Sequence, residues 1–199
     1  MIWILTSPER IHEEAVIIDA LLQAGVDRIM LRKPQWRAPE YDALMEEIDP
    51  AWFPRIIVHD NFSVCNKYPV GGIHLSGKTR DHMTGCELDL CLQRYPNSST
   101  GIHDTAAIAL MHRQFDTLLL SPVFNSISKL GYYGRFAGSL PEKQRRVFAM
   151  GGVDAGNIHQ VWQWGFDGAA LLGAIWQDPF KAVENYQRIQ EIWNRNART

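Results

Sequence analysis

Short apolar runs recur along the chain, and most of them are followed by a stretch with helical periodicity. The runs are rich in β-branched and other apolar residues, which is typical of buried strands. Eight segments have this character: 2–5, 27–31, 55–59, 71–75, 99–103, 116–120, 146–150 and 167–171. The pattern therefore predicts eight strands.

Amphipathic stretches separate most of these runs, with apolar residues recurring every three or four positions. They are clearest at 9–25, 105–115 and 157–165, whereas 79–98 indicates only a brief helix and 176–199 an amphipathic helix that completes an outer ring. Such alternation predicts parallel strands joined by helical crossovers. A doubly wound open sheet and a closed (β/α)8 TIM barrel both accept it, and eight units favour a single barrel domain over residues 1–199.

Composition and charge restrict the classes of partner. Of the 199 residues 46% are hydrophobic, and the formal net charge is −2, so no basic excess favours a nucleic-acid partner. The spacing of Cys65, Cys86 and Cys91 matches neither a zinc site nor a disulfide framework, which indicates a reducing compartment. No stretch approaches the ~18 apolar residues of a membrane span, and the opening lacks the basic region of a secretory signal. We expect a cytoplasmic protein without a membrane partner; homo-oligomerisation stays open.

Glycines follow the last two predicted strands. Gly151 and Gly152 end the run at 146–150, and Gly173 follows the run at 167–171. In a (β/α)8 barrel these two loops commonly hold a phosphate, and glycine lets the main chain approach an anion closely. The glycines therefore predict a phosphate cradle. A simple turn into a helix beginning near Asp154 is the alternative.

Charged or titratable residues follow the other predicted strands, and we expect them to face one rim. They are Arg32 and Lys33 after the second strand, His59 and Asp60 after the third, Lys78 after the fourth, His103 and Asp104 after the fifth, and Lys129 in the loop 121–137 after the sixth. A carboxylate among several cations suits a substrate with several phosphates and a divalent cation.

Several of these residues also have a structural explanation. Asp60 and Asp104 each precede a predicted helix, where an aspartate often caps the helix N-terminus. His74 alternates with apolar neighbours along a strand, which indicates a structural residue held by hydrogen bonds. Lys129 has the alternative of a solvated loop lysine, but the length of its loop favours a functional lid.

Taken in order along the chain, six motifs identify a family. They are LRKP at 31–34, VHDNF at 58–62, GGIHLSG at 71–77, SPVFNSISK at 121–129, FAMGGVDAGNI at 148–158 and GFDGAALLGAI at 165–175. Over nearly its whole length the chain resembles the thiamine phosphate synthase and TenI-like family. The resemblance implies a (β/α)8 barrel. It also implies a transferase that joins a pyrimidine diphosphate to a thiazole phosphate with Mg²⁺ and releases pyrophosphate.

The resemblance also implies a role for each matched residue. Arg32 and Lys129 would bind the diphosphate, and Asp60 would ligate Mg²⁺. The thiazole phosphate would be surrounded by Ser126, Ile127, Ser128, Gly152, Leu172 and Gly173, beside Gly151 of the predicted cradle.

The chain departs from the synthase pattern mainly in the diphosphate half of the site. His59 stands where the family has Asn, Thr79 where it has a second metal-binding Asp, and Gly101 where it has a Ser that contacts diphosphate; Met30 and Pro34 replace the Gln and Lys that flank the arginine. The change from Asp to Thr removes a full negative charge from a hard-cation site.

These departures keep two alternatives open. One is the thiazole tautomerase activity of the TenI-like branch, which needs a phosphate cradle and an acid–base residue but no metal. Pro122 stands where that branch has its catalytic His, so His59 or His103 would have to act in its place. The other is a non-catalytic binder of thiazole phosphate or thiamine phosphate.

Overall fold

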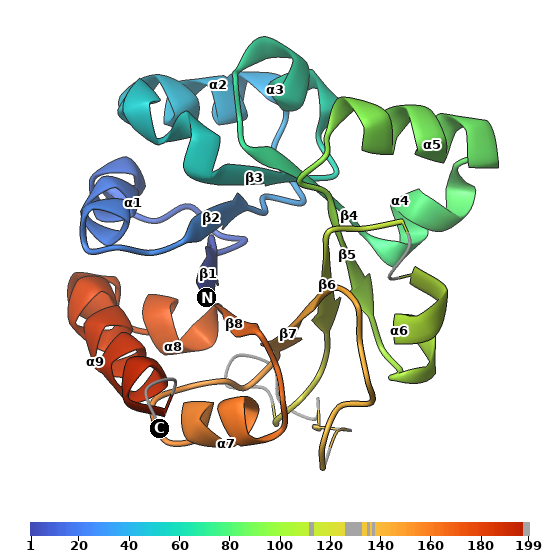
Figure 1. Ribbon diagram of the computed structural model, residues 1–199. Coiled ribbons are helices and arrows are strands. Elements are labelled where there is room, and N and C mark those ends of the chain that lie inside the picture. Colours follow the sequence, from blue (N-terminus) through green and yellow to red (C-terminus); the bar gives the residue numbers. More distant parts are fainter. Residues whose placement is uncertain (112–113, 126–132, 135, 137, 197–199) are drawn as a thin grey trace.

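The computed structural model describes residues 1–111, 114–125, 133–134, 136 and 138–196, and these residues form a closed barrel of eight parallel strands (Figure 1). Each strand pairs with the next, and the last pairs with the first, where Ile4 lies opposite Leu171. The (β/α)8 prediction is confirmed, and every predicted strand is found to within one residue. The strands are β1 (Ile2–Leu5), β2 (Arg28–Leu31), β3 (Ile56–His59), β4 (Gly72–Leu75), β5 (Ser99–Ile102), β6 (Thr117–Leu120), β7 (Arg146–Met150) and β8 (Gly168–Leu171).

Helices surround the barrel (Figure 1). They are α1 (Glu14–Gln23), α2 (Ala38–Glu47), η1 (Pro50–Arg55), α3 (Phe62–Lys67), α4 (Gly77–His82), α5 (Gly85–Arg94), α6 (Ala106–Met111), α7 (Ile158–Gln163), α8 (Gly173–Trp176), η2 (Pro179–Lys181) and α9 (Ala182–Asn196). The stretch between β6 and β7 has no helix in its described residues. None of the described helices is both long and apolar enough to span a lipid bilayer.

The segment 79–98 is more helical than the sequence predicts. Instead of one brief helix it contains most of α4 and all of α5. Two capping side chains explain this: Ser76 accepts the N–H of Thr79 before α4, and Thr84 and Glu87 form a reciprocal capping box before α5. These caps fix the residues at which the two helices begin.

The core has two layers, separated by the barrel wall. Residues that face outward from the strands pack against the helices and form the larger apolar cluster. Residues that face inward form the smaller one: Trp3, Leu5, Met30, Ile57, Leu119, Phe148 and Ala170, with Met1, Met150 and Leu172 at its edges. At the C-terminal ends of β3 and β4 the inward positions are His59 and His74, so the inner filling is polar on that side of the barrel, whereas Met150 and Leu172 continue the apolar cluster on the side of β7 and β8.

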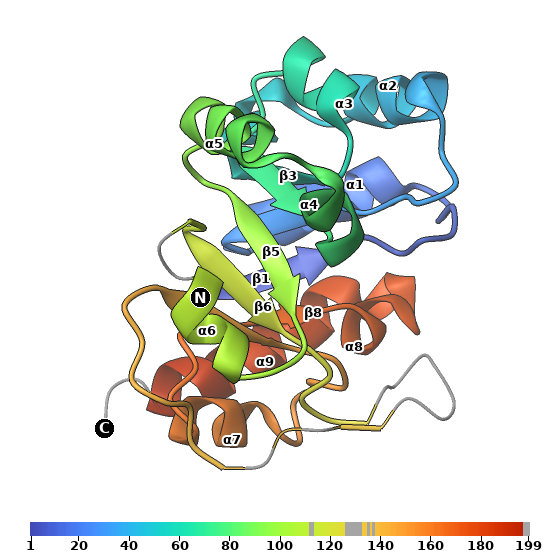
Figure 2. The same cartoon turned by 90° about the vertical axis from the view of Figure 1, so that its right-hand side faces the viewer.

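Acidic side chains form hydrogen bonds at the N-terminal ends of the strands. Asp27 Oδ2 accepts the N–H of Ile2 at 2.6 Å, and Asp167 Oδ2 accepts the N–H of Val147 at 2.8 Å. Lys143 Nζ donates to the other Asp167 oxygen at 2.8 Å. These contacts close the N-terminal face, which lies with the chain's N-terminus at the left of Figure 2. The C-terminal rim of the strands, called the mouth below, is the face that carries the candidate site.

Candidate functional site

Arg32 is the first residue after β2, and the buried side chain of Thr6 fixes its main chain. The N–H of Arg32 donates to Thr6 Oγ1 at 2.9 Å, and the Thr6 hydroxyl lies 3.4 Å from the carbonyl oxygen of Arg32. The Arg32 side chain is half-buried, and among the described residues its guanidinium has no hydrogen-bond or ion-pair partner. The mouth therefore contains a cation that can accept an anionic ligand.

Lys33 does not share this role, so the prediction that it faces the rim with Arg32 is wrong. Its side chain is buried, and its Nζ lies 2.7 Å from both carboxylate oxygens of Glu14 and 2.8 Å from the carbonyl oxygen of Glu9. Burial lowers the pKa of Lys33, and the hydrogen bond to Glu14 opposes that shift. Burial likewise raises the pKa of Glu14, against the effect of Lys33. The pair anchors the loop after β2 to α1.

The rings of His59 and His74 stack inside the barrel, near the mouth. Their ring centroids are 5.1 Å apart with an interplanar angle of 27°. His74 Nδ1 lies 3.0 Å from Ser99 Oγ, and His59 Nδ1 lies 3.4 Å from Asp60 Oδ2. Burial is the main cause that lowers the pKa of both rings, and the pKa of His74 is lowered further than that of His59. Both rings are therefore neutral at pH 7. His74 is buried and hydrogen-bonded, as its predicted structural role requires.

Asp60 has a strained backbone and does not cap α3. Its φ is 53°, in the left-handed region that non-glycine residues rarely adopt. Its N–H donates to the carbonyl oxygen of His74 at 2.9 Å, and its Oδ1 accepts the N–H of Ser76 at 2.9 Å. The capping bond comes instead from Asn61, whose Oδ1 accepts the N–H of Val64 at 3.2 Å. Strain of this kind tends to be retained at functional positions, which supports Asp60 as a site residue.

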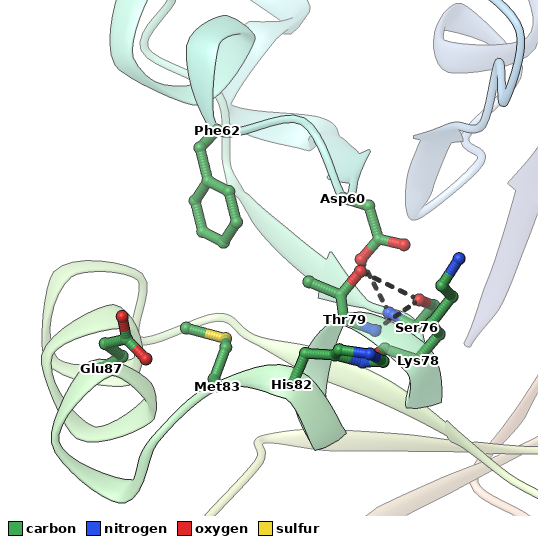
Figure 3. Close-up of a pocket in the computed structure, with 8 residues that line it drawn as sticks. All are labelled: Asp60, Phe62, Ser76, Lys78, Thr79, His82, Met83 and Glu87. Atoms are coloured by element: carbon green, nitrogen blue, oxygen red, sulfur yellow. Dashed lines mark hydrogen bonds between the residues drawn. The ribbon is translucent and has the colours of Figure 1, made fainter.

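A pocket opens from Asp60 toward the outside of the barrel, between α3 and the α4–α5 pair (Figure 3). Its volume is about 670 Å³, and Asp60, Ser76 and Thr79 lie together in it, joined by hydrogen bonds. The pocket is lined by Asp60, Phe62, Ser76, Lys78, Thr79, His82, Met83 and Glu87. It thus combines an apolar wall with charged groups.

The side chains around Asp60 do not by themselves fit a resident magnesium ion. Mg²⁺ requires near-octahedral oxygen coordination. Within the described part of the chain, no three His, Cys, Asp or Glu side chains gather where they could hold a metal ion. One Asp60 oxygen already accepts the Ser76 N–H, and the Thr79 hydroxyl lies 3.1 Å from Ser76 Oγ. Asp60 as a magnesium ligand stays a prediction.

The glycines after β7 permit a very close chain approach. Gly151 and Gly152 have φ values of 92° and 68°, and a Cβ on Gly152 would lie 2.1 Å from the carbonyl oxygen of Asn125. The Gly151 carbonyl accepts the N–H of Phe124 at 3.0 Å, and the Gly152 carbonyl accepts Asn157 Nδ2 at 2.8 Å. The glycines therefore have a packing role, in addition to any role toward a ligand.

No acceptor is found for the N–H of Gly151, Gly152 or Gly173 in the described part of the chain. Leu172, which precedes Gly173, packs against the apolar interior of the barrel at the mouth. The structure thus brings the free amides of the last two strand–helix loops to the same rim as Arg32 and Asp60.

The remaining predicted residues divide into two groups. Ser126, Ile127, Ser128 and Lys129 lie outside the described residues. His103 is exposed, and its Nδ1 lies 2.7 Å from the carbonyl oxygen of Ser121. Asp104 Oδ1 accepts the N–H of Ala106 at 2.9 Å, so the capping explanation holds for Asp104.

Three contacting residues are absent from the sequence predictions. Thr6, Ser76 and Asn157 hold Arg32, Asp60 and Gly152 in place. Their position directly after strands β1, β4 and β7, or in the turn that follows, is a signal that could have identified them. Short polar side chains at strand ends are common, however, so the signal alone does not assign a role.

Comparisons with known proteins agree with this architecture. A family model described as thiamine monophosphate synthase matches residues 2–175. A relative from Geobacter sulfurreducens, named "Putative thiamine-phosphate synthase", is 25% identical over 171 residues, which are 82% of this chain and 79% of the relative.

Two solved structures with the same fold are named thiamine phosphate pyrophosphorylase. The one from Bacteroides thetaiotaomicron has a TM-score of 0.73 and 21% identity, and the match covers 97% of both chains. The one from Pyrococcus furiosus has a TM-score of 0.77 and 15% identity, and the match covers 98% of this chain and 96% of that one.

Proposed function

Because the chain belongs to the thiamine monophosphate synthase family, we propose that it joins hydroxymethylpyrimidine diphosphate to thiazole phosphate, giving thiamine phosphate and pyrophosphate. One observation carries the proposal beyond family membership. At the mouth lie two chemically different groups that could each bind an anion: the guanidinium after β2, and main-chain amides after β7 and β8 that have no acceptor in the described part of the chain. A reaction between two phosphorylated substrates needs both.

The thiazole phosphate is assigned to the glycine loops. Free amides of Gly151, Gly152 and Gly173 can donate to phosphate oxygens without a change in protonation, and Leu172 offers an apolar contact to the ring. Ser126, Ile127 and Ser128 are proposed to complete this half from the loop after β6.

The diphosphate is assigned to the other side of the mouth, to Arg32 and Lys129. The bond between the pyrimidine methylene carbon and the diphosphate oxygen breaks, and its electron pair leaves with the oxygen. The resulting pyrimidine cation is stabilised by resonance and is captured by the lone pair of the thiazole nitrogen. Fixed cations accelerate this step because negative charge grows on the leaving group. No protein nucleophile takes part.

Thiazole tautomerisation is the second candidate, and the stacked histidines favour it. His59 is neutral, lies in the mouth and has Asp60 Oδ2 3.4 Å from its Nδ1. A neutral imidazole oriented by a carboxylate is a common general base. In this alternative His59 would move a proton on the thiazole ring while the glycine loops hold its phosphate.

An assay of the purified protein with both substrates separates the candidates. Synthase activity is supported if thiamine phosphate forms and if Arg32→Gln and Lys129→Ala abolish its formation. Isomerisation of thiazole phosphate without metal, lost in His59→Gln, supports the tautomerase. Tight binding of thiazole phosphate without turnover of either kind contradicts both and identifies a binder.

A further inference from the structure

Lys78 differs from the other lysines that the structure describes. The described chain contains five lysines, and four of them form ion pairs: Lys33 with Glu14 at 2.7 Å, Lys67 with Asp42 at 2.7 Å, Lys143 with Asp167 at 2.8 Å and Lys181 with Asp178 at 3.9 Å. For the ammonium of Lys78 no hydrogen-bond or ion-pair partner exists in the described part of the chain.

The place of Lys78 is also distinctive. It is the second residue of α4, three residues after the C-terminal end of β4, and it lines the same 670 Å³ pocket as Asp60. Figure 3 shows its side chain extending toward the end of the pocket at which the Asp60 carboxylate lies. Two neighbouring side chains make hydrogen bonds to the main chain instead of to the Lys78 ammonium. Asp60 Oδ1 accepts the Ser76 N–H, and His82 Nδ1 lies 2.6 Å from the Lys78 carbonyl oxygen.

At the Asp60 end of the pocket, the charge of the carboxylate is balanced by an ammonium. Two carboxylates line the pocket, but Glu87 lies at the far end, where it accepts the N–H and the hydroxyl of Thr84. Asp60 is the carboxylate near the Lys78 ammonium, and Thr79 beside it is neutral. Because like charges repel, a free ammonium opposes a divalent cation in the same pocket and attracts a multiply charged anion. Among the described residues, no three His, Cys, Asp or Glu side chains gather around Asp60 to hold a resident magnesium ion.

We infer that Lys78 is a catalytic residue that binds the diphosphate of the substrate and supplies the positive charge that a resident divalent ion would otherwise supply. The inference rests on the proposed synthase reaction. As the C–O bond breaks, its electron pair passes to the diphosphate oxygen, and Lys78 remains protonated and donates a hydrogen bond to the departing pyrophosphate. The thiazole nitrogen then forms the new C–N bond, so no proton, oxidant or reductant is required.

Calorimetric titration of the protein with inorganic pyrophosphate, in the presence of EDTA, tests the inference without any need for turnover. We expect the wild-type protein to bind pyrophosphate without Mg²⁺. Lys78→Gln is expected to raise the dissociation constant about 10- to 100-fold, since a hydrogen bond to a charged group is lost. Lys78→Arg keeps the charge and is expected to stay within a few-fold of wild type.

Lys67→Gln is the matched control. It changes the net charge by the same amount, but the ammonium of Lys67 is already paired with Asp42, on α2 and outside the pocket. We expect it to bind pyrophosphate as wild type does. The double variant Lys78→Gln/Thr79→Asp adds a carboxylate and removes the ammonium, and it is expected to bind pyrophosphate only when Mg²⁺ is added.

Two results would overturn the inference: unchanged pyrophosphate binding in Lys78→Gln, or wild-type binding that appears only with Mg²⁺. A failure of the proposed function looks different. If the wild-type protein forms no thiamine phosphate but loses pyrophosphate affinity in Lys78→Gln, the reaction is wrong and the anion site stands. If it forms thiamine phosphate and Lys78→Gln is fully active in EDTA, the reaction stands and the role of Lys78 is wrong.

Discussion

Lys33 and Glu14 form an ion pair almost completely withdrawn from water, with 0% and 3% of their side chains exposed. Lys33→Met removes one partner and leaves a buried carboxylate, so we expect a loss of about 3–5 kcal/mol in the free energy of unfolding. Urea denaturation followed by circular dichroism measures this. The double variant Lys33→Met/Glu14→Gln should recover much of the loss, because no uncompensated charge remains. Equal stability of the single variant and wild type would contradict the packing described.

The cysteines give a second prediction at the scale of single residues. Cys86 is exposed, whereas Cys65 is buried, and burial raises the pKa of its thiol to about 12. Burial also raises the pKa of Cys91. Since the thiolate is the reactive form, a raised pKa leaves Cys65 and Cys91 protonated at pH 8.

Titration with a thiol reagent at pH 8 should therefore show one fast thiol in the native protein and three after unfolding in urea. Cys86→Ser is the control and should abolish the fast phase. Rapid modification of two or more thiols in the native protein would contradict the burial of Cys65 and Cys91.

At the scale of elements, the start of α3 separates a structural side chain from its functional neighbour. Asn61 accepts the N–H of Val64, so Asn61→Ala should lower the free energy of unfolding by about 1 kcal/mol. Asp60→Asn should change it by less than about 0.5 kcal/mol, because asparagine tolerates a φ of 53° and can still accept the Ser76 N–H. Urea denaturation of both variants measures the two free energies of unfolding. A larger loss in Asp60→Asn than in Asn61→Ala would show that Asp60 caps the helix.

The elements differ in how far the sequence determines them. Most of the strands are predictable because they are buried runs of apolar residues, whose signal is local. β5 (Ser99–Ile102) has a weaker local signal and is predictable from its place in the alternation of strands and helices. Helices α4 and α5 are underestimated because each begins at a capping side chain, Ser76 or Thr84, whose hydrogen bonds are seen only in the folded chain. The burial of Lys33 is not predictable from its neighbours, since its partner Glu14 lies 19 residues earlier on another element.

The candidate site shows the same division. The residue types at the strand ends predict an anion site at the mouth, and the structure places Arg32, His59 and Asp60 there with Gly151, Gly152 and Gly173. The sequence cannot distinguish Asp60 from Asn61 as the helix cap, nor a paired lysine from a free one, because both depend on side-chain directions set by tertiary packing.

At the scale of the whole molecule, the two ends of the barrel should separate stability from activity. Asp167→Ala removes the acceptor for the Val147 N–H and the partner of Lys143 at the N-terminal face, so we expect unfolding to become easier by about 1–3 kcal/mol. Well below the unfolding midpoint, thiamine phosphate formation should keep its wild-type kcat, because these residues lie at the end opposite the mouth.

Arg32→Gln is the matched variant at the mouth and should have the opposite effect. In the described chain its guanidinium has no partner to lose, so stability should stay within about 0.5 kcal/mol of wild type. Activity should fall by on the order of 100-fold, since a cation that stabilises the leaving diphosphate is lost. Urea denaturation and the product assay, run on both variants, measure the two effects. If both variants lose stability and activity together, the separation of a stabilising end from a reactive end is wrong for this barrel.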